Sequence, residues 1–431
     1  MGKVEFPKVL IISHNLYDDT NNIGKTLVSL FQGWPKDKIA QIYFRNDSPS
    51  FKYCDEYYCI TDKDVLKSAL TLGIKKAGSV LQVGESLTIS DAETNLYQVG
   101  NHRRPIVSFI RDTMWALGGW KSNELETWVK DVARPDIILF APNDYTLAYR
   151  IAIYIEELIN KPLIPFYMDD SFYYGCKSSF LDQIRRRSLR KMAKKVHRYA
   201  KQIFTICDYM SDEYQKLFGL NCHAFMNSVT IPSSESLRTI SDDETIIFSY
   251  LGNLHSNRWK SIAEIGRVLD DIRNKDHIKV EFRIYSASVL EKNVKELFNS
   301  IASIRFMGKV EPSKVRDTQL QADVLVHVEA FDDASVNSTR LSLSTKLPEY
   351  LSVHRAIFAY GPKEIASMRY LKDNNIAEVC FEQSALHDGI YSILSPQKRA
   401  DLADRGYRRA EAFHNIEMVS KKFQRKISEN S

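Results

Sequence analysis

The chain has 431 residues, and its 59 Lys and Arg against 54 Asp and Glu give a formal net charge of +5. A chain of this length exceeds one typical domain, so we expect two domains that each bury a core. No run of about 18 apolar residues occurs, which argues against a membrane-spanning helix. The six cysteines form no Cys-x-x-Cys pair, so we expect reduced thiols in a cytoplasm and no structural zinc site.

The N-terminal half alternates between apolar runs and helical patterns, as α/β proteins do. Residues 8–13 (KVLIIS) predict a first strand and not a signal peptide, because polar residues follow directly. A loop rich in Asn and Asp then leads to Gly24, and a helical pattern begins at Lys25. Two more apolar runs, residues 136–141 and 163–168, predict further strands.

Two adjacent carboxylates, Asp169 and Asp170, follow the strand predicted over residues 163–168. The carboxyl end of a buried strand is where sites form in α/β proteins. Two neighbouring carboxylates would push their pKa values apart, which suits general acid and base chemistry or the orientation of a hydroxyl group. We therefore regard both as candidate catalytic residues. The alternative is that one of them caps the next helix.

Residues 178–202 concentrate the positive charge, with nine Lys and Arg against one acidic residue, Asp182. Apolar residues recur at three- and four-residue steps from Leu181 to Ile203, which predicts an amphipathic helix with a cationic polar face. Such a helix could lie on an anionic membrane surface. The alternative is a core-packed helix with a solvated basic face. A nucleic-acid partner is not expected, because no stacking aromatic residues are interleaved with the charges.

Residues 232–244 are polar, rich in serine and without periodicity, which predicts a linker between the domains. Beyond it the α/β alternation returns, with strands predicted over residues 246–251, 280–285, 304–307 and 324–328. The first of these runs ends at Gly252. Arg258 and Lys260 follow in the turn toward the next helix, where a nucleotide diphosphate at the carboxyl end of a parallel strand would lie.

Residues 339–361 have the order of a polar loop, a short helix and a buried strand. Ser344 or Thr345 is the expected N-cap, since small hydroxyl residues precede an apolar helical pattern. Lys346 adds positive charge where backbone N–H groups favour a phosphate, and Glu349 could accept hydrogen bonds from the two hydroxyls of a ribose. The alternative is an ordinary helix start with solvated charges.

In this order, the segments YLGN, IRFMGKV, ADVLVHVEAFDD and STKLPEYLSVHRAIFAYGP resemble the nucleotide-binding domain of the GT-B glycosyltransferases, specifically of glycosyltransferase family 4. The segment STKLPEYL also resembles a branch of capsule and exopolysaccharide transferases. The resemblance implies an α/β protein with two Rossmann-like domains facing a central cleft. Residues 1–231 would form the acceptor domain and residues 245–395 the nucleotide-sugar domain. Residues 396–431 would form a helix that crosses back to the first domain.

The resemblance also implies roles for individual residues. The nucleotide-binding positions would be Gly24, Gly252, Arg258, Lys260, Ser344, Thr345, Lys346 and Glu349. Family 4 enzymes often carry an acceptor-side histidine, which adds His102 to the catalytic candidates. One position departs from the family pattern, because Leu341 stands eight residues before Glu349, where the family has a second glutamate. An apolar side chain cannot make the hydrogen bond that this glutamate makes to the donor sugar.

The resemblance implies transfer of a sugar from a UDP- or GDP-sugar to a lipid-linked or polysaccharide acceptor in bacterial surface glycan biosynthesis, with retention at the anomeric carbon. No cofactor besides the nucleotide sugar and no metal is implied, because cations and helix N-termini neutralise the leaving diphosphate. We expect a cytoplasmic enzyme, bound peripherally to the inner face of the plasma membrane through residues 178–202. The alternatives are a nucleotide-sugar epimerase of the same fold and a non-catalytic membrane-associated scaffold, while no Lys–His pyridoxal site supports a phosphorylase.

Overall fold

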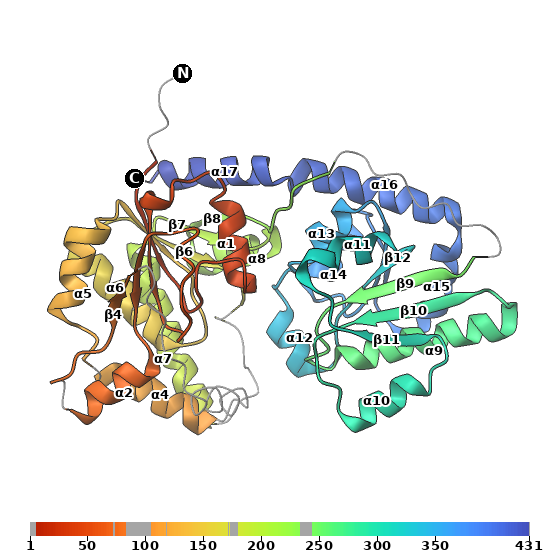
Figure 1. Ribbon diagram of the computed structural model, residues 1–431, viewed down its shortest axis with the longest axis horizontal. Helices are drawn as coiled ribbons and strands as arrows, with labels where there is room; N and C mark the ends of the chain where they lie inside the picture. The colour runs from red at the N-terminus through yellow and green to blue at the C-terminus, as the bar shows by residue number, and fades with distance from the viewer. Residues whose placement is uncertain are drawn as a thin grey trace, which may run out of the picture. The chain divides into compact units, whose positions relative to one another are not determined.

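The computed structural model describes residues 6–71, 74–82, 105–117, 119–170, 172, 180–232 and 244–430 (Figure 1). The chain divides into two compact units. Unit 1 contains Met1–Met226 together with Val419–Ser431, and unit 2 contains Asn227–Met418. Among the described residues, no helix is long and apolar enough to cross a membrane.

Unit 1 is built on an eight-stranded sheet with the order β4-β3-β2-β1-β5-β6-β7-β8. Neighbouring strands pair in parallel, except that β3 and β4 are antiparallel. The strands are β1 Val9–Ile12, β2 Ile39–Tyr43, β3 Glu56–Cys59, β4 Ser79–Leu81, β5 Ile137–Phe140, β6 Leu163–Tyr167, β7 Gln202–Thr205 and β8 Asn221–Ala224. The helices are α1 Asn22–Leu30, η1 Lys36–Lys38, α2 Asp62–Leu70, α4 Pro105–Leu117, α5 Asn123–Thr127, η2 Trp128–Ala133, α6 Thr146–Ile159, α7 Phe180–Tyr199, α8 Asp208–Phe218 and most of α17, Ile416–Ser428.

The strand order of unit 1 reverses between β1 and β5. The strands β2 to β4 lie on one side of β1, and β5 to β8 lie on the other. Every residue of β1 (VLII) and β5 (IILF) is buried, as expected for apolar runs in central parallel strands. Open α/β sheets bind ligands outside the carboxyl ends of the strands at such a reversal. The loops after β1 and β5 therefore flank the edge of unit 1 where a ligand is expected.

Unit 2 has a six-stranded, fully parallel sheet with the order β11-β10-β9-β12-β13-β14. The strands are β9 Ile246–Leu251, β10 Val280–Tyr285, β11 Ile304–Gly308, β12 Val324–Val328, β13 Ala356–Tyr360 and β14 Glu378–Cys380. The helices are α9 Arg258–Asp276, α10 Lys292–Asn299, η3 Pro312–Lys314, α11 Val315–Leu320, α12 Asp333–Thr339, α13 Leu347–Ser352, α14 Ala366–Asp373, η4 Gln383–Ala385, α15 Leu386–Leu394 and α16 Pro396–Phe413. The strand order reverses between β9 and β12, so the loops after these two strands flank the expected binding edge of unit 2.

The strands predicted over residues 246–251, 280–285 and 324–328 are confirmed residue for residue. Each strand is a run rich in β-branched and aromatic residues, and a polar residue or a glycine follows it. These signals in the sequence define where the strand begins and ends. The predicted linker lies outside the described residues except for its ends, Pro232 and Glu244.

The single C-terminal helix predicted from residue 396 is wrong, because the structure has two helices, α16 and α17. They are separated at His414, which is fully buried. Its Nδ1 lies 3.1 Å from the Asn227 carbonyl oxygen and its Nε2 lies 2.6 Å from the Tyr370 hydroxyl. The backbone at the break is satisfied by Val229, whose N–H donates to His414 O at 2.8 Å and whose carbonyl accepts from Ile416 N at 3.0 Å. The helix therefore breaks where a neighbouring segment offers these hydrogen bonds.

Helix α17 completes the core of unit 1 through Phe423, which is fully buried. Its ring centroid lies 5.1 Å from those of Phe31 and Phe225, and 5.6 Å from that of Phe204. These partners are the C-cap residue of α1, a residue of β7 and the residue after β8, all from the N-terminal part of the chain. Helix α17 from the C-terminal part of the chain therefore packs into the core that the N-terminal part forms.

We predict that Phe423→Ala destabilises unit 1 by about 3–5 kcal/mol, because it removes a buried aromatic side chain and leaves a cavity. Urea unfolding followed by tryptophan fluorescence measures this, since four of the five tryptophans lie in unit 1. Met418→Ala on the same helix is the control, because that side chain is 55% exposed. Equal unfolding midpoints for the two variants would contradict this role of α17.

Candidate functional site

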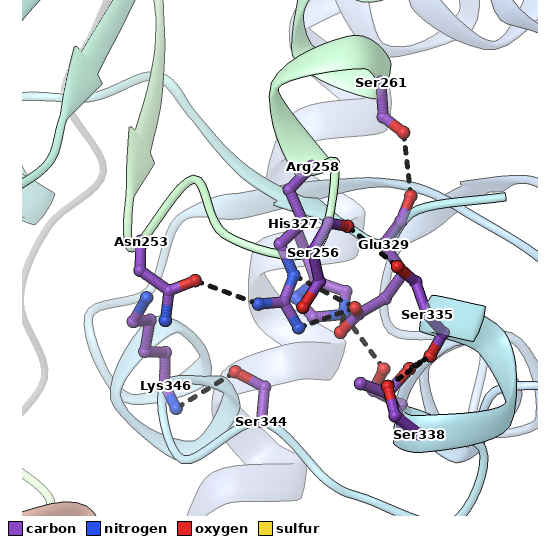
Figure 2. A network of polar contacts seen from close by, with 12 residues as sticks. Asn253, Ser256, Arg258, Ser261, His327, Glu329, Ser335, Ser338, Ser344 and Lys346 are labelled. Atoms are coloured by element: carbon purple, nitrogen blue, oxygen red, sulfur yellow. Dashed lines mark hydrogen bonds and ion pairs between the residues drawn. The ribbon is translucent and has the colours of Figure 1, made fainter. Parts of the chain in front are cut away.

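The loops after β9 and β12 are joined by an ion pair between Arg258 and Glu329 (Figure 2). Arg258 is the first residue of α9, and its Nε and Nη2 donate to Glu329 Oε2 at 3.0 and 2.7 Å. Its Nη1 donates to Asn253 Oδ1 at 3.1 Å. Ser261 Oγ, one turn further along α9, donates to the carbonyl oxygen of Glu329 at 2.8 Å. The guanidinium is therefore held at the point where the strand order of unit 2 reverses.

Two further contacts tie the same loops together. Asn257 Nδ2 donates to Asp332 Oδ2 at 3.0 Å, and Ser335 Oγ donates to the Ser256 carbonyl oxygen at 3.1 Å. Ser256 and Asn257 both have positive φ angles, 55° and 58°, so the turn into α9 is tight. These bonds hold the start of α9 in one place beside the end of β12.

His327 lies inside this network as a neutral side chain. Its Nε2 lies 3.0 Å from Ser367 Oγ and 3.6 Å from Glu329 Oε1. Burial lowers the pKa of His327 to about 3, and the charges of Arg258 and Lys346 lower it further in the same direction. His327 therefore contributes hydrogen bonds at neutral pH and no positive charge.

Lys346 brings a second cation to the end of β9. A Cβ added to Gly252 would lie 2.4 Å from Lys346 Nζ, so the ammonium group lies directly against the Gly252 backbone. Burial and the charge of Arg258 lower the pKa of Lys346 to about 8, and the carboxylates of Glu349 and Glu329 only partly oppose this. The surroundings therefore compensate the charge of this ammonium group only in part. A bound anion would supply that compensation.

The start of α13 differs from the prediction. Leu347 is the first helical residue and Lys346 is the N-cap, without a side-chain cap, so the expected capping by Ser344 or Thr345 is wrong. Ser344 Oγ instead accepts a hydrogen bond at 3.4 Å from N of Lys346, which is the N-cap residue itself and not a residue of the helix. Thr345 lies in the turn between them, and Glu349 lies in the first turn of α13.

Tyr350 fixes α13 against the end of β9. Its hydroxyl accepts a hydrogen bond from Leu251 N at 3.0 Å and lies 3.3 Å from Leu251 O. This contact explains how the segment that carries Ser344, Lys346 and Glu349 comes to lie beside Gly252. Lys260, by contrast, is exposed, and its ammonium lies 5.5 Å from the ring of Trp259. The structure brings Arg258 and Lys346 together and leaves Lys260 outside.

In unit 1 the two aspartates after β6 have different surroundings. Asp169 is exposed, whereas Asp170 is 2% exposed and accepts a hydrogen bond from the Tyr214 hydroxyl at 3.0 Å. Burial raises the pKa of Tyr214, and the neighbouring charge of Asp170 raises it further. Asp170 is therefore part of a buried network, whereas Asp169 is exposed.

The other two candidates in unit 1 are Gly24 and His102. Gly24 lies in the first turn of α1, where an added Cβ would come 2.2 Å from Asp18 O and 2.8 Å from Leu16 O. Close approach of the preceding loop thus explains the glycine. His102 lies outside the described residues.

Sequence reasoning did not single out a polar cluster at the reversal of the unit 1 sheet. His14 follows β1, Tyr145 precedes α6, and their ring centroids lie 5.6 Å apart. The Arg111 guanidinium from α4 lies 4.1 Å from the Tyr145 ring centroid. Burial lowers the pKa of His14 to about 3, with contributions from Arg111 and Arg45, so this histidine is neutral. The signal in the sequence was a histidine in the loop just after a buried strand, and Glu329 has the corresponding place after β12 in unit 2.

The basic helix predicted over residues 178–202 is α7, and its cations divide between two faces. Arg185 and Arg186 are buried, and Arg185 donates to the Asp144 carbonyl oxygen and lies 3.7 Å from its carboxylate. The predicted helix is therefore confirmed, but Arg185 and Arg186 do not belong to its cationic polar face, because both side chains are buried. The exposed cations are Arg187, Lys191, Lys194 and Arg198. Their spacing of four, three and four residues places them in one stripe.

No protein-family model matches the chain. No curated protein matches it either. Solved structures match nearly its whole length. HepE of Anabaena, in complex with UDP-glucose, is 12% identical with a TM-score of 0.60, over 98% of this chain and 100% of that chain. A glycosyltransferase of Rickettsia africae is 10% identical with a TM-score of 0.58, over 98% of this chain and 99% of that chain. A UDP-forming trehalose-phosphate synthase of Burkholderia vietnamiensis is 10% identical with a TM-score of 0.58, over 98% of this chain and 100% of that chain.

These similarities define the class of the fold. The chain has the GT-B fold, with two Rossmann-like α/β domains that each carry a parallel sheet. Similar structures named glycosyltransferase and trehalose-phosphate synthase share that fold. At identities of 10 to 12%, the similarity establishes the fold and leaves the activity to be argued from the site.

We predict that Lys346→Met changes the pH dependence of stability. The folded pKa of about 8 lies below the unfolded value of 10.5, so burial of the charged form destabilises the wild type below pH 8. As the pH rises from about 8 toward 10.5, the folded state loses its proton before the unfolded state, and the wild type gains stability that the variant does not. The stability of wild type relative to Lys346→Met should therefore rise by about 2–3 kcal/mol over that range.

Chemical denaturation between about pH 7 and pH 10 measures this difference. Lys260→Met is the matched control, because it removes an exposed lysine from the same region. Its difference from the wild type should not change with pH. A pH-independent difference for Lys346→Met as well would show that the ammonium group is not buried.

Proposed function

We propose that the chain is a glycosyltransferase that uses a nucleotide sugar as donor. The observation that carries this proposal is the position of the Lys346 ammonium, only partly compensated, against the backbone of Gly252 and beside the fixed guanidinium of Arg258. A nucleoside diphosphate is an anion of the size and charge that two such cations and a close backbone would hold. HepE, which shares the fold, was solved with UDP-glucose, and this supports UDP as the nucleotide.

The site offers a role for each of its polar groups in the transfer. Arg258 and Lys346 stabilise the negative charge that develops on the leaving diphosphate, and they are positioned before the substrate arrives. Glu349 accepts hydrogen bonds from the ribose hydroxyls. Glu329 orients Arg258 and is a positioning residue in this scheme. Leu341 is fully buried, so the donor-sugar contact of the family glutamate must come from another residue or be absent.

The acceptor we propose is a lipid-linked or polysaccharide glycan of bacterial surface biosynthesis, with retention at the anomeric carbon. The exposed stripe on α7, Arg187, Lys191, Lys194 and Arg198, supports a peripheral attachment of unit 1 to an anionic membrane. The enzyme would then act on the inner face of the plasma membrane. Attachment there brings it to an acceptor that diffuses in the bilayer.

One assay separates this proposal from its alternatives. A transferase releases UDP from a UDP-sugar when a glycan acceptor is supplied. A nucleotide-sugar epimerase interconverts the sugar and releases no UDP. A non-catalytic scaffold remains an alternative because the buried Leu341 cannot contact the donor sugar. Such a scaffold binds the nucleotide sugar but neither releases UDP nor interconverts the sugar.

We predict that Lys346→Met weakens UDP binding roughly 10- to 100-fold, because it removes a hydrogen bond to a charged group. Glu349→Gln should weaken UDP and leave inorganic pyrophosphate unaffected, since only UDP carries the ribose. Titration calorimetry at one fixed salt concentration measures both. Lys260→Met serves as the control and should bind UDP as the wild type does. If Lys260→Met loses as much affinity as Lys346→Met, the diphosphate is not held at Gly252.

We predict that replacing the α7 stripe with glutamine, at Arg187, Lys191, Lys194 and Arg198, weakens binding to phosphatidylglycerol vesicles roughly a hundredfold or more. Salt should weaken the wild type in the same direction, since exposed charges are screened. The control removes four exposed lysines of unit 1 outside α7, at Lys36, Lys130, Lys216 and Lys421. Equal loss in both variants would mean that net charge alone governs binding. Arg185 and Arg186 are left intact because their burial would confound the result with misfolding.

A further inference from the structure

Gln41 is a fully buried polar residue in the middle of β2. All five residues of this strand (IAQIY) are buried, and Gln41 lies opposite Ile11 of the neighbouring strand β1. Strands inside a parallel sheet usually carry apolar residues, because a buried amide without hydrogen bonds is costly. A glutamine at this place therefore calls for partners that satisfy its amide.

The partners of the Gln41 amide all lie in residues 13–17, which follow β1 and which we call the β1 loop. Gln41 Oε1 accepts a hydrogen bond from Tyr17 N at 2.9 Å. Gln41 Nε2 donates to Ser13 Oγ at 2.8 Å and to the Asn15 carbonyl oxygen at 2.9 Å. Ser13 Oγ donates in turn to the same carbonyl oxygen at 2.7 Å. One side chain thus satisfies backbone groups that a strand or helix would otherwise pair.

Other residues hold the β1 loop on either side of these bonds. Phe44 N, just after β2, donates to the His14 carbonyl oxygen at 3.3 Å. Asn21, the N-cap residue of α1, donates through Nδ2 to the Leu16 carbonyl oxygen at 3.0 Å. Gln41 supplies the bonds in between. A segment without regular secondary structure is therefore fixed in one conformation.

The β1 loop carries His14 to the reversal of the unit 1 sheet. The His14 ring lies beside that of Tyr145, and burial is the main cause that keeps its imidazole neutral, with help from Arg111 and Arg45. A histidine that reaches water regains an ordinary pKa. The protonation state of His14 is therefore a direct measure of the position of the loop.

Two polar atoms at this edge lack a partner. His14 Nδ1 and Asn143 Nδ2 are buried and have no hydrogen-bond partner within the described part of the chain. Asn143 lies in the loop after β5, and its Oδ1 accepts a hydrogen bond from Tyr145 N at 3.1 Å. Folded proteins rarely leave buried polar atoms without a partner. Two such atoms after β1 and β5 mark the edge at which open α/β sheets bind ligands.

We propose that Gln41 is a positioning residue of the unit 1 edge, because its amide fixes the β1 loop so that His14 lies beside Tyr145 where the acceptor is received. The inference rests on the proposed function, since a transferase needs an acceptor site in addition to its nucleotide site. Gln41 itself touches no ligand in this scheme and acts through the loop. A glutamine that only stabilised unit 1 would leave His14 in place when replaced.

The test replaces Gln41 with methionine in the full chain, because methionine has a similar length and no hydrogen-bonding amide. Histidine ¹³C NMR between about pH 5 and pH 8 measures the result, and the His14 signal is the one that disappears in His14→Gln. The wild-type signal should not titrate in this range. In Gln41→Met it should titrate near the ordinary value of 6.5, because the loop no longer keeps the imidazole buried.

A second variant and a matched control accompany this one. Ser13→Ala removes one member of the same network and should move the His14 midpoint in the same direction by less, which also serves if Gln41→Met does not fold. Gln202 is a buried glutamine of β7 whose Nε2 has no hydrogen-bond partner among the residues that the structure describes. Gln202→Met is therefore the same change in the same sheet, and it should leave His14 without titration. If it frees His14 as Gln41→Met does, the effect is general loosening and the proposal is wrong.

The consequence for function is measured in parallel on wild type and Gln41→Met. UDP affinity by calorimetry should be equal, because the nucleotide site belongs to unit 2. Release of UDP from UDP-glucose, with water, glucose, maltose and dextran as acceptor probes, should fall roughly tenfold or more, since a small displacement of a positioned group slows a reaction strongly.

The outcomes separate the two proposals. A His14 signal that still does not titrate in Gln41→Met would overturn the role of Gln41, and so would a freed His14 with unchanged UDP release. If wild type releases no UDP with any probe while Gln41→Met frees His14, the positioning of the loop stands and the proposed glycosyltransferase activity fails.

Discussion

The ion pair between Arg258 and Glu329 is the interaction on which the rest of the unit 2 site depends. It joins the first residue of α9 to the residue that follows β12, across the point where the strand order reverses. Glu329 is buried, so loss of its partner would leave a buried charge uncompensated, which destabilises proteins by about 3–5 kcal/mol. A pair of this kind adds little net stability, because desolvation offsets the attraction. Its effect is positional, since it holds a guanidinium in place before any ligand binds.

The same pair sets the electrostatics of its neighbours. Burial and the charge of Arg258 lower the pKa values of both Lys346 and His327. Lys346 therefore holds its proton less tightly, and His327 is a neutral imidazole. Glu329 accepts two short hydrogen bonds from Arg258, and its charge raises the pKa of Lys346 only partly against the effect of burial. The ammonium of Lys346 is therefore left with less compensation than it needs. An anion at Gly252 would raise the pKa of Lys346 and strengthen the whole network at once.

The sequence predicted the sheet of unit 2 more closely than it predicted the site. Strand limits follow from local apolar runs, so Ile246–Leu251 could be identified without tertiary contacts. Glu329 and His327 were missed because their partners lie far along the chain, and Arg258 is 71 residues from Glu329. Lys260 was expected beside Arg258 because the two are close in sequence, yet it points to solvent. Helical periodicity likewise could not show that Arg185 faces inward, since its partner Asp144 lies 41 residues away along the chain.

The two units repeat one physical arrangement with different chemistry. In each, a central parallel pair ends at a reversal of strand order, and a polar residue follows a fully buried strand there, His14 in unit 1 and Glu329 in unit 2. The unit 2 edge presents cations beside a glycine and suits a diphosphate. The unit 1 edge presents a neutral imidazole next to Tyr145, with the Arg111 guanidinium over the tyrosine ring. The difference between the two edges is the reason for which we propose transfer from a nucleotide sugar and not nucleotide binding alone.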